Sequence, residues 1–141
     1  MNVGGDPTMQ TDKRRILVVD DRVSDTTFIK LALESTNDYV VKEENDADAA
    51  ISTAEEFQPD LILMDVMMPG MDGGELAFRF RENRQLGSVP IVFLTAAVTK
   101  KEVERGGGLV GGSPFLAKPI TIPELVDCLE HYLGAQGISA A

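Results

Sequence analysis

The sequence predicts an α/β fold: a single doubly wound, five-stranded parallel sheet with helices on both faces. First, short apolar runs alternate five times with stretches of helical spacing. Second, the runs are nearly continuous in apolar residues, which is typical of parallel strands buried on both faces. Third, the chain has 141 residues, of which 43% are hydrophobic, enough for one domain with a proper core and too few for a second large module.

The expected strands are the five apolar runs, which end at polar or turn residues. They span Arg15–Asp20, Tyr39–Glu43, Asp60–Asp65, Val89–Thr95 and Pro114–Lys118. Pro59 marks the junction between the second helix and the third strand, because the residue before a proline avoids helical backbone angles.

Apolar residues at helical spacing predict helices between these strands. The first helix is marked by Phe28, Leu31 and Ala32, and the third by Leu76, Ala77 and Phe80. Longer apolar stripes mark the second helix (Ala47, Ala50, Ile51, Ala54, Phe57) and the last helix (Leu125, Val126, Leu129, Tyr132, Leu133). Thr121 is expected to cap the last helix, with Pro123 in its first turn and Glu124 completing a capping box.

A glycine-rich segment interrupts the pattern where a fourth helix is due. Thr99 to Arg105 is compatible with a helix, but five glycines follow within Gly106–Gly112. Each interior glycine costs about 1 kcal/mol relative to alanine in a helix. We therefore expect a short or frayed, mobile helix. A phosphate-binding loop is disfavoured, because the run lacks the Lys-Ser/Thr ending of that motif.

Charge and composition exclude several classes of function. The formal net charge of −10 repels phosphate backbones, which disfavours direct binding of nucleic acid or anionic membranes. No apolar stretch approaches the length of a membrane span, and the polar N-terminus lacks the apolar core of a signal peptide. The single Cys128 suits a reducing, cytoplasmic location. Residues 1–12 are expected to form a disordered leader and residues 135–141 a loose tail.

Polar residues follow four of the apolar runs, where the strands should end. Asp20 and Asp21 follow the first run and Asp65 the third, while Thr95 follows the fourth and Lys118 the fifth. Because the carboxyl ends of parallel strands form one ligand-binding edge, we expect these side chains to converge. Converging carboxylates favour a hard cation, Mg²⁺ or else Mn²⁺. Lys118 and Thr95 would complement phosphoryl oxygens, and Asp65 is placed to act as a nucleophile.

Four of these residues also have a simpler structural interpretation. Asp20 and Asp21 would cap the first helix, and Asp65 would lie in a loop. Lys118 would be a solvated surface cation. The co-occurrence of five such residues at four strand ends favours the functional interpretation. The only histidine, His131, is expected on an exposed helix face, poorly placed as a phosphoryl donor.

The chain resembles the receiver domain of two-component response regulators, from about Lys13 to Leu133. The matching motifs are Asp20-Asp21, Asp65-Val-Met-Met-Pro-Gly-Met-Asp-Gly73, Thr95-Ala96 and Lys118-Pro119. The resemblance implies a flavodoxin-like strand order 2-1-3-4-5 in a receiver domain over residues 13–134. It also implies a cytoplasmic signalling domain that catalyses only its own phosphorylation and dephosphorylation, with a sensor histidine kinase or histidine phosphotransfer protein as partner.

The resemblance assigns a role to each matching residue. Asp65 would accept the phosphoryl group from a phosphohistidine. Mg²⁺ would be bound by the side chains of Asp21 and Asp65, by the backbone carbonyl of Met67, and by Asp20 mostly through water. Lys118, before a cis peptide bond to proline, would pair with the phosphate.

Two further residues would form the switch. The hydroxyl of Thr95 would move onto the phosphoryl group. The switch aromatic falls at Phe115, which lacks the hydroxyl common at this position and should therefore prefer burial.

Three alternatives remain open. A haloacid-dehalogenase-like phosphatase uses similar chemistry but needs an acid two residues after its nucleophile, where this chain has Met67. A mononucleotide binder needs a Ser, Thr and Gly loop where this chain has Asp20-Asp21. A degenerate receiver would bind partners without phosphorylation.

Overall fold

A computed structural model describes residues 13–68, 70–95, 109–110 and 113–134. Its central sheet contains strands β1 (Arg14–Val19), β2 (Tyr39–Glu44), β3 (Leu61–Asp65), β6 (Ile91–Thr95) and β8 (Ser113–Ala117). These strands are parallel and lie in the order β2-β1-β3-β6-β8. Counted along the chain, that order is the predicted 2-1-3-4-5, so the fold prediction is confirmed.

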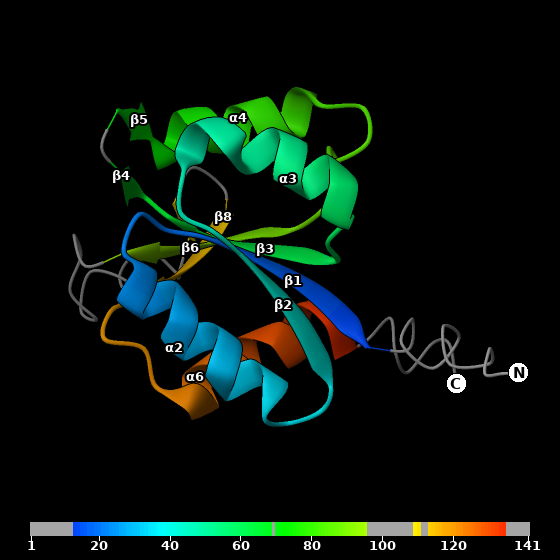
Figure 1. The fold of residues 1–141 in the computed structure, drawn as a ribbon, viewed down its shortest axis with the longest axis vertical. Coiled ribbons are helices and arrows are strands. Elements are labelled where there is room, and N and C mark those ends of the chain that lie inside the picture. The colour runs from blue at the N-terminus through cyan, green and yellow to red at the C-terminus, as the bar shows by residue number, and fades with distance from the viewer. Residues whose placement is uncertain (1–12, 69, 96–108, 111–112, 135–141) are drawn as a thin grey trace, which may run out of the picture.

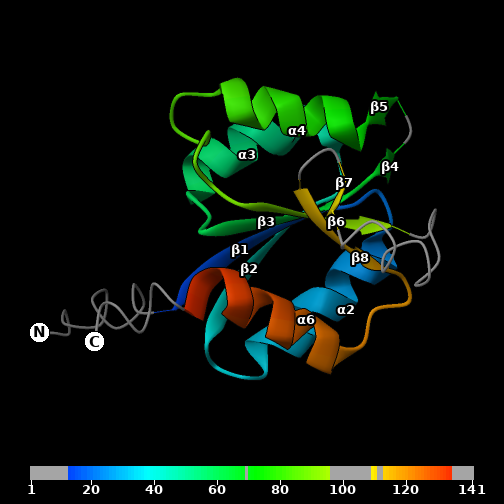
Figure 2. The ribbon, with the colours of Figure 1, turned by 180° about the vertical axis from the view of Figure 1, so that it is seen from behind.

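Helices cover both faces of the sheet in a three-layer arrangement. The helices are α2 (Val23–Glu34), α3 (Ala50–Phe57), α4 (Gly73–Glu82) and α6 (Ile122–Leu129), with a 3₁₀ turn η1 (Ala47–Ala49) and a π-helical turn η2 (Glu130–Gly134). Helices α3 and α4 cover one face, and α2 and α6 cover the other, as the front and back views show (Figures 1 and 2).

Two hydrophobic cores form because side chains alternate along each strand. On β1, Leu17 and Val19 belong to the core beneath α3 and α4, whereas Ile16 and Val18 belong to the core beneath α2 and α6. All four side chains are fully buried. The same alternation runs along β3 and β6, which explains why their sequences read as nearly unbroken apolar runs.

The ends of two helices behave as the sequence predicts. Thr121 caps α6, because its hydroxyl accepts a hydrogen bond from the Glu124 backbone N–H (3.2 Å) while the Glu124 carboxylate accepts one from the Thr121 backbone N–H (3.2 Å). Helix α3 ends at Phe57, and its C-cap residue Gln58 has a positive φ of 55° just before Pro59 and β3.

The first helix differs from expectation. Phe28 and Leu31, two of the residues that mark it in the sequence, are 47% and 65% exposed. The buried face of α2 instead presents Thr26, Ile29 and Leu33 to the core. A helix with apolar residues on both faces leaves the sequence pattern ambiguous about which face is buried.

Short strands appear where none was expected. Strand β7 (Leu109–Val110), inside the glycine-rich run, pairs antiparallel with β8 at the edge of the sheet (Figure 2). Strands β4 (Met67–Met68) and β5 (Met71–Asp72) pair across a turn in which Gly70 has a φ of 78°. Glycine adopts this backbone conformation without steric cost.

Several predictions fall outside the described residues. They are the leader 1–12, the tail 135–141, the helix Thr99–Arg105, Pro69, and residues 106–108 and 111–112 of the glycine-rich run. In the part of the chain that is described, no helix combines the length and the apolar character needed to cross a membrane.

Candidate functional site

The parallel sheet brings the predicted site residues to one edge. In the register of β1 and β3, Val19 pairs with Met64, so Asp20 and Asp65 are the next residues on neighbouring strands. Thr95 is the last residue of β6 and pairs with Ala117 of β8, and Lys118 follows directly. These residues are adjacent because all five strands end at this edge.

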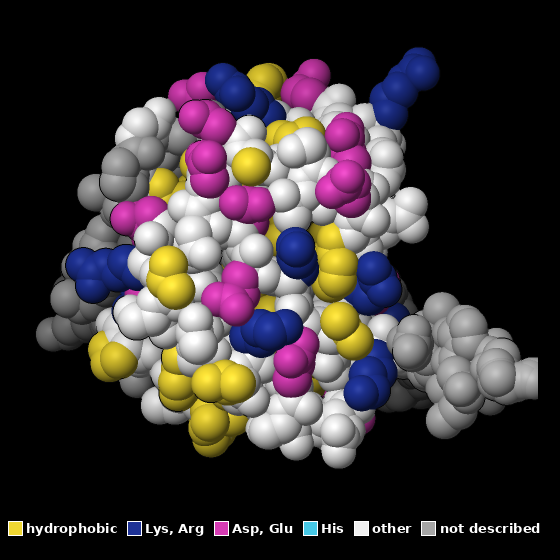
Figure 3. All heavy atoms as spheres, viewed as in Figure 1, with side chains coloured by type: hydrophobic (Ala, Val, Ile, Leu, Met, Phe, Trp, Pro, Cys, Tyr) yellow, Lys and Arg dark blue, Asp and Glu magenta, His cyan; other side chains and the backbone are white. Residues whose placement is uncertain are grey.

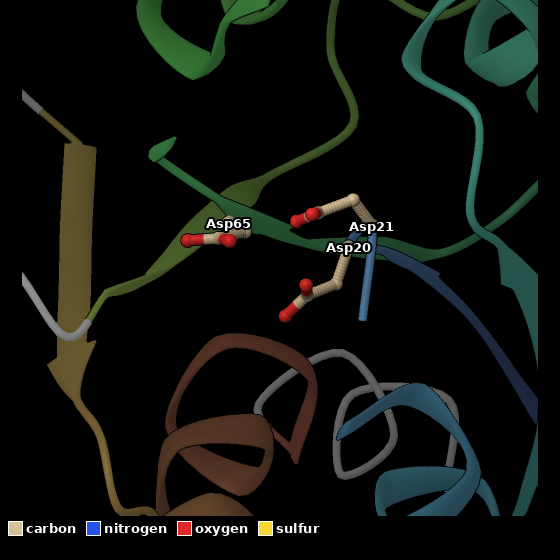
Figure 4. A group of neighbouring side chains, drawn as sticks. All are labelled: Asp20, Asp21 and Asp65. Atoms are coloured by element: carbon tan, nitrogen blue, oxygen red, sulfur yellow. The ribbon is translucent and has the colours of Figure 1, made fainter. Parts of the chain in front are cut away.

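Three carboxylates converge at this edge. One oxygen each from Asp20, Asp21 and Asp65 lies within 4.8 Å of the others. Asp20 is fully buried, Asp65 is 6% exposed, and Asp21 is exposed. Figure 4 shows Asp20 and Asp21 at the end of β1 and Asp65 at the end of β3, with the Asp21 carboxylate directed toward Asp65. Negative charges this close repel one another and favour a bound cation.

Lys118 supplies positive charge to the cluster. Its ammonium donates hydrogen bonds to Asp20 Oδ2 (2.7 Å) and Asp25 Oδ2 (3.0 Å) and lies 3.8 Å from Asp65 Oδ2. Burial lowers the pKa of Lys118, but these hydrogen bonds and the charges of Asp20 and Asp65 outweigh that effect and raise the pKa overall. The side chain is therefore charged at neutral pH. The peptide bond from Lys118 to Pro119 is cis, as expected.

Backbone and side-chain hydrogen bonds fix Asp20 in place. Its Oδ1 accepts from the Arg22 backbone N–H (2.9 Å), and its backbone carbonyl accepts from Asn45 Nδ2 (2.8 Å). Arg22, not Asp20 or Asp21, occupies the N-cap position of α2. The interpretation of these two aspartates as simple helix caps is therefore wrong.

The residues that could hold a metal ion can be judged from their donor atoms. Asp20, Asp21 and Asp65 present carboxylate oxygens and no sulfur or imidazole ligand. Such a set suits a hard divalent cation such as Mg²⁺ or Mn²⁺. Met67 lies in β4, two residues beyond Asp65, and the role of its backbone carbonyl as a further ligand stays a prediction.

The remaining residues named from the sequence are Phe115, Thr95 and His131, and they do not belong to the charged cluster. Phe115 lies on β8 opposite Phe93 and is 6% exposed, so its preference for burial is met, while its role as a switch stays a prediction. The role of the Thr95 hydroxyl also stays a prediction. His131 is exposed in η2 and packs edge-on against Tyr132, with 4.7 Å between ring centroids.

Sequence reasoning missed two residues that contact the site. Asp25 accepts a hydrogen bond from Lys118, and Asn45 supports the backbone of Asp20. Asp25 lies in the first turn of α2, where an acidic residue is common because it complements the helix dipole. Only the three-dimensional arrangement shows that Asp25 also contacts Lys118.

Comparisons with known proteins identify a family with this architecture. A family model described as the response regulator receiver domain matches residues 16–130. The transcriptional regulatory protein ResD of Bacillus subtilis (strain 168) is 37% identical over 118 residues, which cover 83% of this chain and 47% of ResD. The chain therefore spans about half the length of that relative.

Two further proteins are similar over almost their whole length. The polar-differentiation response regulator DivK of Brucella anthropi is 27% identical over 86% of this chain and 97% of DivK. The crystal structure of the Vibrio cholerae chemotaxis protein CheY4 is 29% identical, with a TM-score of 0.73 over 86% of this chain and 99% of CheY4.

Proposed function

Because the chain belongs to the response regulator receiver domain family, we propose that it accepts a phosphoryl group on Asp65 in a Mg²⁺-dependent phosphorelay and thereby switches a protein-interaction surface. The observation that carries the proposal is the convergence of three carboxylates with the ammonium of Lys118 at the carboxyl edge of the sheet.

The chemistry follows from this arrangement. A carboxylate oxygen of Asp65 attacks phosphorus, and the bond between phosphorus and the imidazole nitrogen of the donor breaks. The products are an acyl phosphate on Asp65 and a free histidine on the donor. Lys118, which directly follows β8, places its positive charge near the phosphoryl oxygens.

Asp20, Asp21 and Asp65 would hold the metal ion. When bound, Mg²⁺ offsets the negative charge that the carboxylates and the phosphoryl oxygens share. Without a cation, the acidic cluster repels an incoming phosphoryl group. The proposal therefore predicts that chelation of divalent cations prevents phosphorylation.

An apolar surface beside the site supports the proposed partner. Val23, Phe28 and Leu31 of α2 and Ile122 of α6 are exposed, and apolar side chains gather over the α2 and α6 layer (Figure 3). A pocket of about 250 Å³ opens here, lined by Asp25, Phe28, Ile29, Lys118, Pro119 and Ile120. A histidine kinase or phosphotransfer protein that docks on this surface would bring its histidine next to Lys118.

The test is intact mass after incubation with acetyl phosphate and Mg²⁺. We expect one added phosphoryl group on the parent protein and none when EDTA replaces Mg²⁺. Asp65→Asn should take up no phosphoryl group under either condition. An adduct that forms in EDTA, or one that forms equally on Asp65→Asn, would refute the assignment.

A further inference from the structure

Asp25 binds the ammonium of Lys118, the same group that pairs with the phosphoryl group in the proposed function. The Lys118 ammonium is 3.0 Å from Asp25 Oδ2 and 2.7 Å from Asp20 Oδ2, both within hydrogen-bond reach. Asp65 Oδ2, at 3.8 Å, is beyond that reach. In the unphosphorylated protein, then, the hydrogen bonds of Lys118 go to Asp20 and Asp25, and the proposed acceptor contributes a longer ion pair.

The two holders of Lys118 differ in what else they do. Asp20 is fully buried and belongs to the cluster of three carboxylates, so its contact with Lys118 lies inside the proposed metal site. Asp25 is outside that cluster, on the first turn of α2, and its side chain is about one-third exposed. Asp25 can therefore be altered without removing a proposed metal ligand or emptying the core.

Phosphorylation changes the balance of charge around Lys118. A phosphoryl group on Asp65 brings additional negative charge and new acceptor oxygens close to the ammonium. Pairing with those oxygens draws the ammonium toward Asp65, so the phosphoryl group and the Asp25 carboxylate compete for the same cation.

From these contacts we infer that Asp25 is a positioning residue that opposes the phosphorylated state by competing with the phosphoryl group for Lys118. The inference rests on the proposed phosphorylation of Asp65. It makes Asp25 an adjustable element of the switch, since any residue at this position sets how readily Lys118 is released.

A purely structural role for Asp25 makes a different prediction. An acid in the first turn of a helix stabilises the helix dipole, and this effect concerns folding alone. Glu75 offers a matched control, because it also lies in the first turn of a helix that starts at the same edge of the sheet. Its carboxylate pairs with Arg79 (2.9 Å) and makes no such contact with Lys118.

The experiment measures the affinity for beryllofluoride, which stands in for the phosphoryl group, at saturating Mg²⁺. Asp25→Asn should bind beryllofluoride roughly twofold to fivefold more tightly than the parent, the range expected for a partly exposed charge pair. Glu75→Gln should bind like the parent. Asp25→Glu retains the charge and should return the affinity toward the parent value.

The outcomes separate this inference from the function on which it rests. If Asp65→Asn abolishes binding but Asp25→Asn and Glu75→Gln behave alike, the role of Asp25 is wrong and the proposed function survives. The role of Asp25 is also wrong if Asp25→Glu matches Asp25→Asn, because charge would then be irrelevant. If the parent binds no beryllofluoride, or Asp65→Asn binds it equally, the proposed function fails and the inference fails with it.

Discussion

At the scale of single residues, the ammonium of Lys118 pairs with a fully buried carboxylate, that of Asp20. Asp20 is fully buried, and a buried carboxylate is costly unless it is hydrogen-bonded and paired. Lys118 and the Arg22 backbone N–H together meet this need. The residues that we propose for function therefore also bear on stability, because they hold charge inside the protein.

Lys118→Met should destabilise the protein in the absence of divalent cations. The substitution removes the ammonium that pairs with the buried Asp20 carboxylate, at an expected cost of about 1–3 kcal/mol in the free energy of unfolding. Urea denaturation in EDTA measures this cost. Mg²⁺ should recover part of the loss, because it neutralises the same cluster of carboxylates.

The control for this prediction is Lys42→Met, which removes an exposed lysine of β2. Its effect should stay within about 0.5 kcal/mol, as is usual for surface substitutions. If Lys118→Met is as stable as the parent in EDTA, the carboxylates do not depend on Lys118 for their stability.

At the scale of elements, α2 combines a structural face with an exposed apolar face. Thr26, Ile29 and Leu33 anchor the helix to the sheet, and the Thr26 hydroxyl donates to Glu43 Oε1 of β2 (2.7 Å). Phe28 and Leu31 remain exposed, and Phe28 lines the pocket at Lys118. Exposed apolar residues grouped near a functional site commonly mark a surface that binds a partner.

Phe28→Ala should slow phosphotransfer from a phosphorylated histidine kinase that is able to phosphorylate the parent protein. A loss of roughly tenfold or more in rate is expected if Phe28 is a central contact, since truncated interface residues of this kind cost over 1 kcal/mol. Phosphorylation by acetyl phosphate should be unchanged, because that small donor needs no docking surface.

Phe78→Ala is the matched control, because Phe78 is similarly exposed (61%) but lies on α4, which covers the opposite face of the sheet. It should leave both reactions unchanged. Equal slowing by the two substitutions, or slowing with acetyl phosphate as well, would argue against α2 as the docking surface.

At the scale of the whole molecule, the sequence predicts the features that depend on where strands end and on the regular spacing of apolar residues. The parallel sheet and its strand order follow from five apolar runs and a family resemblance, and the convergence of Asp20, Asp21 and Asp65 follows from the geometry of parallel strands. The site was predictable because each of its residues ends a strand or follows one within two residues.

Other features depend on contacts between distant segments and left no clear signal. Strand β7 has two residues within a glycine-rich run, too short for a periodic pattern. The apolar residues of α2 predicted the helix but not which face is buried. The sequence shows Asp25 only as a common first-turn acid. Its contact with Lys118, 93 residues away, arises because α2 lies beside the segment that follows β8.

The most direct test of the central claim locates the phosphoryl group on the chain. After incubation with acetyl phosphate and Mg²⁺, borohydride reduction converts an aspartyl phosphate into homoserine, which peptide mass spectrometry identifies by position. We expect homoserine at position 65 and unmodified aspartate at positions 20, 21 and 25. Unreduced aspartate at position 65 in protein that carries a phosphoryl group, or homoserine at one of the other three positions, would contradict the assignment of Asp65 as the acceptor.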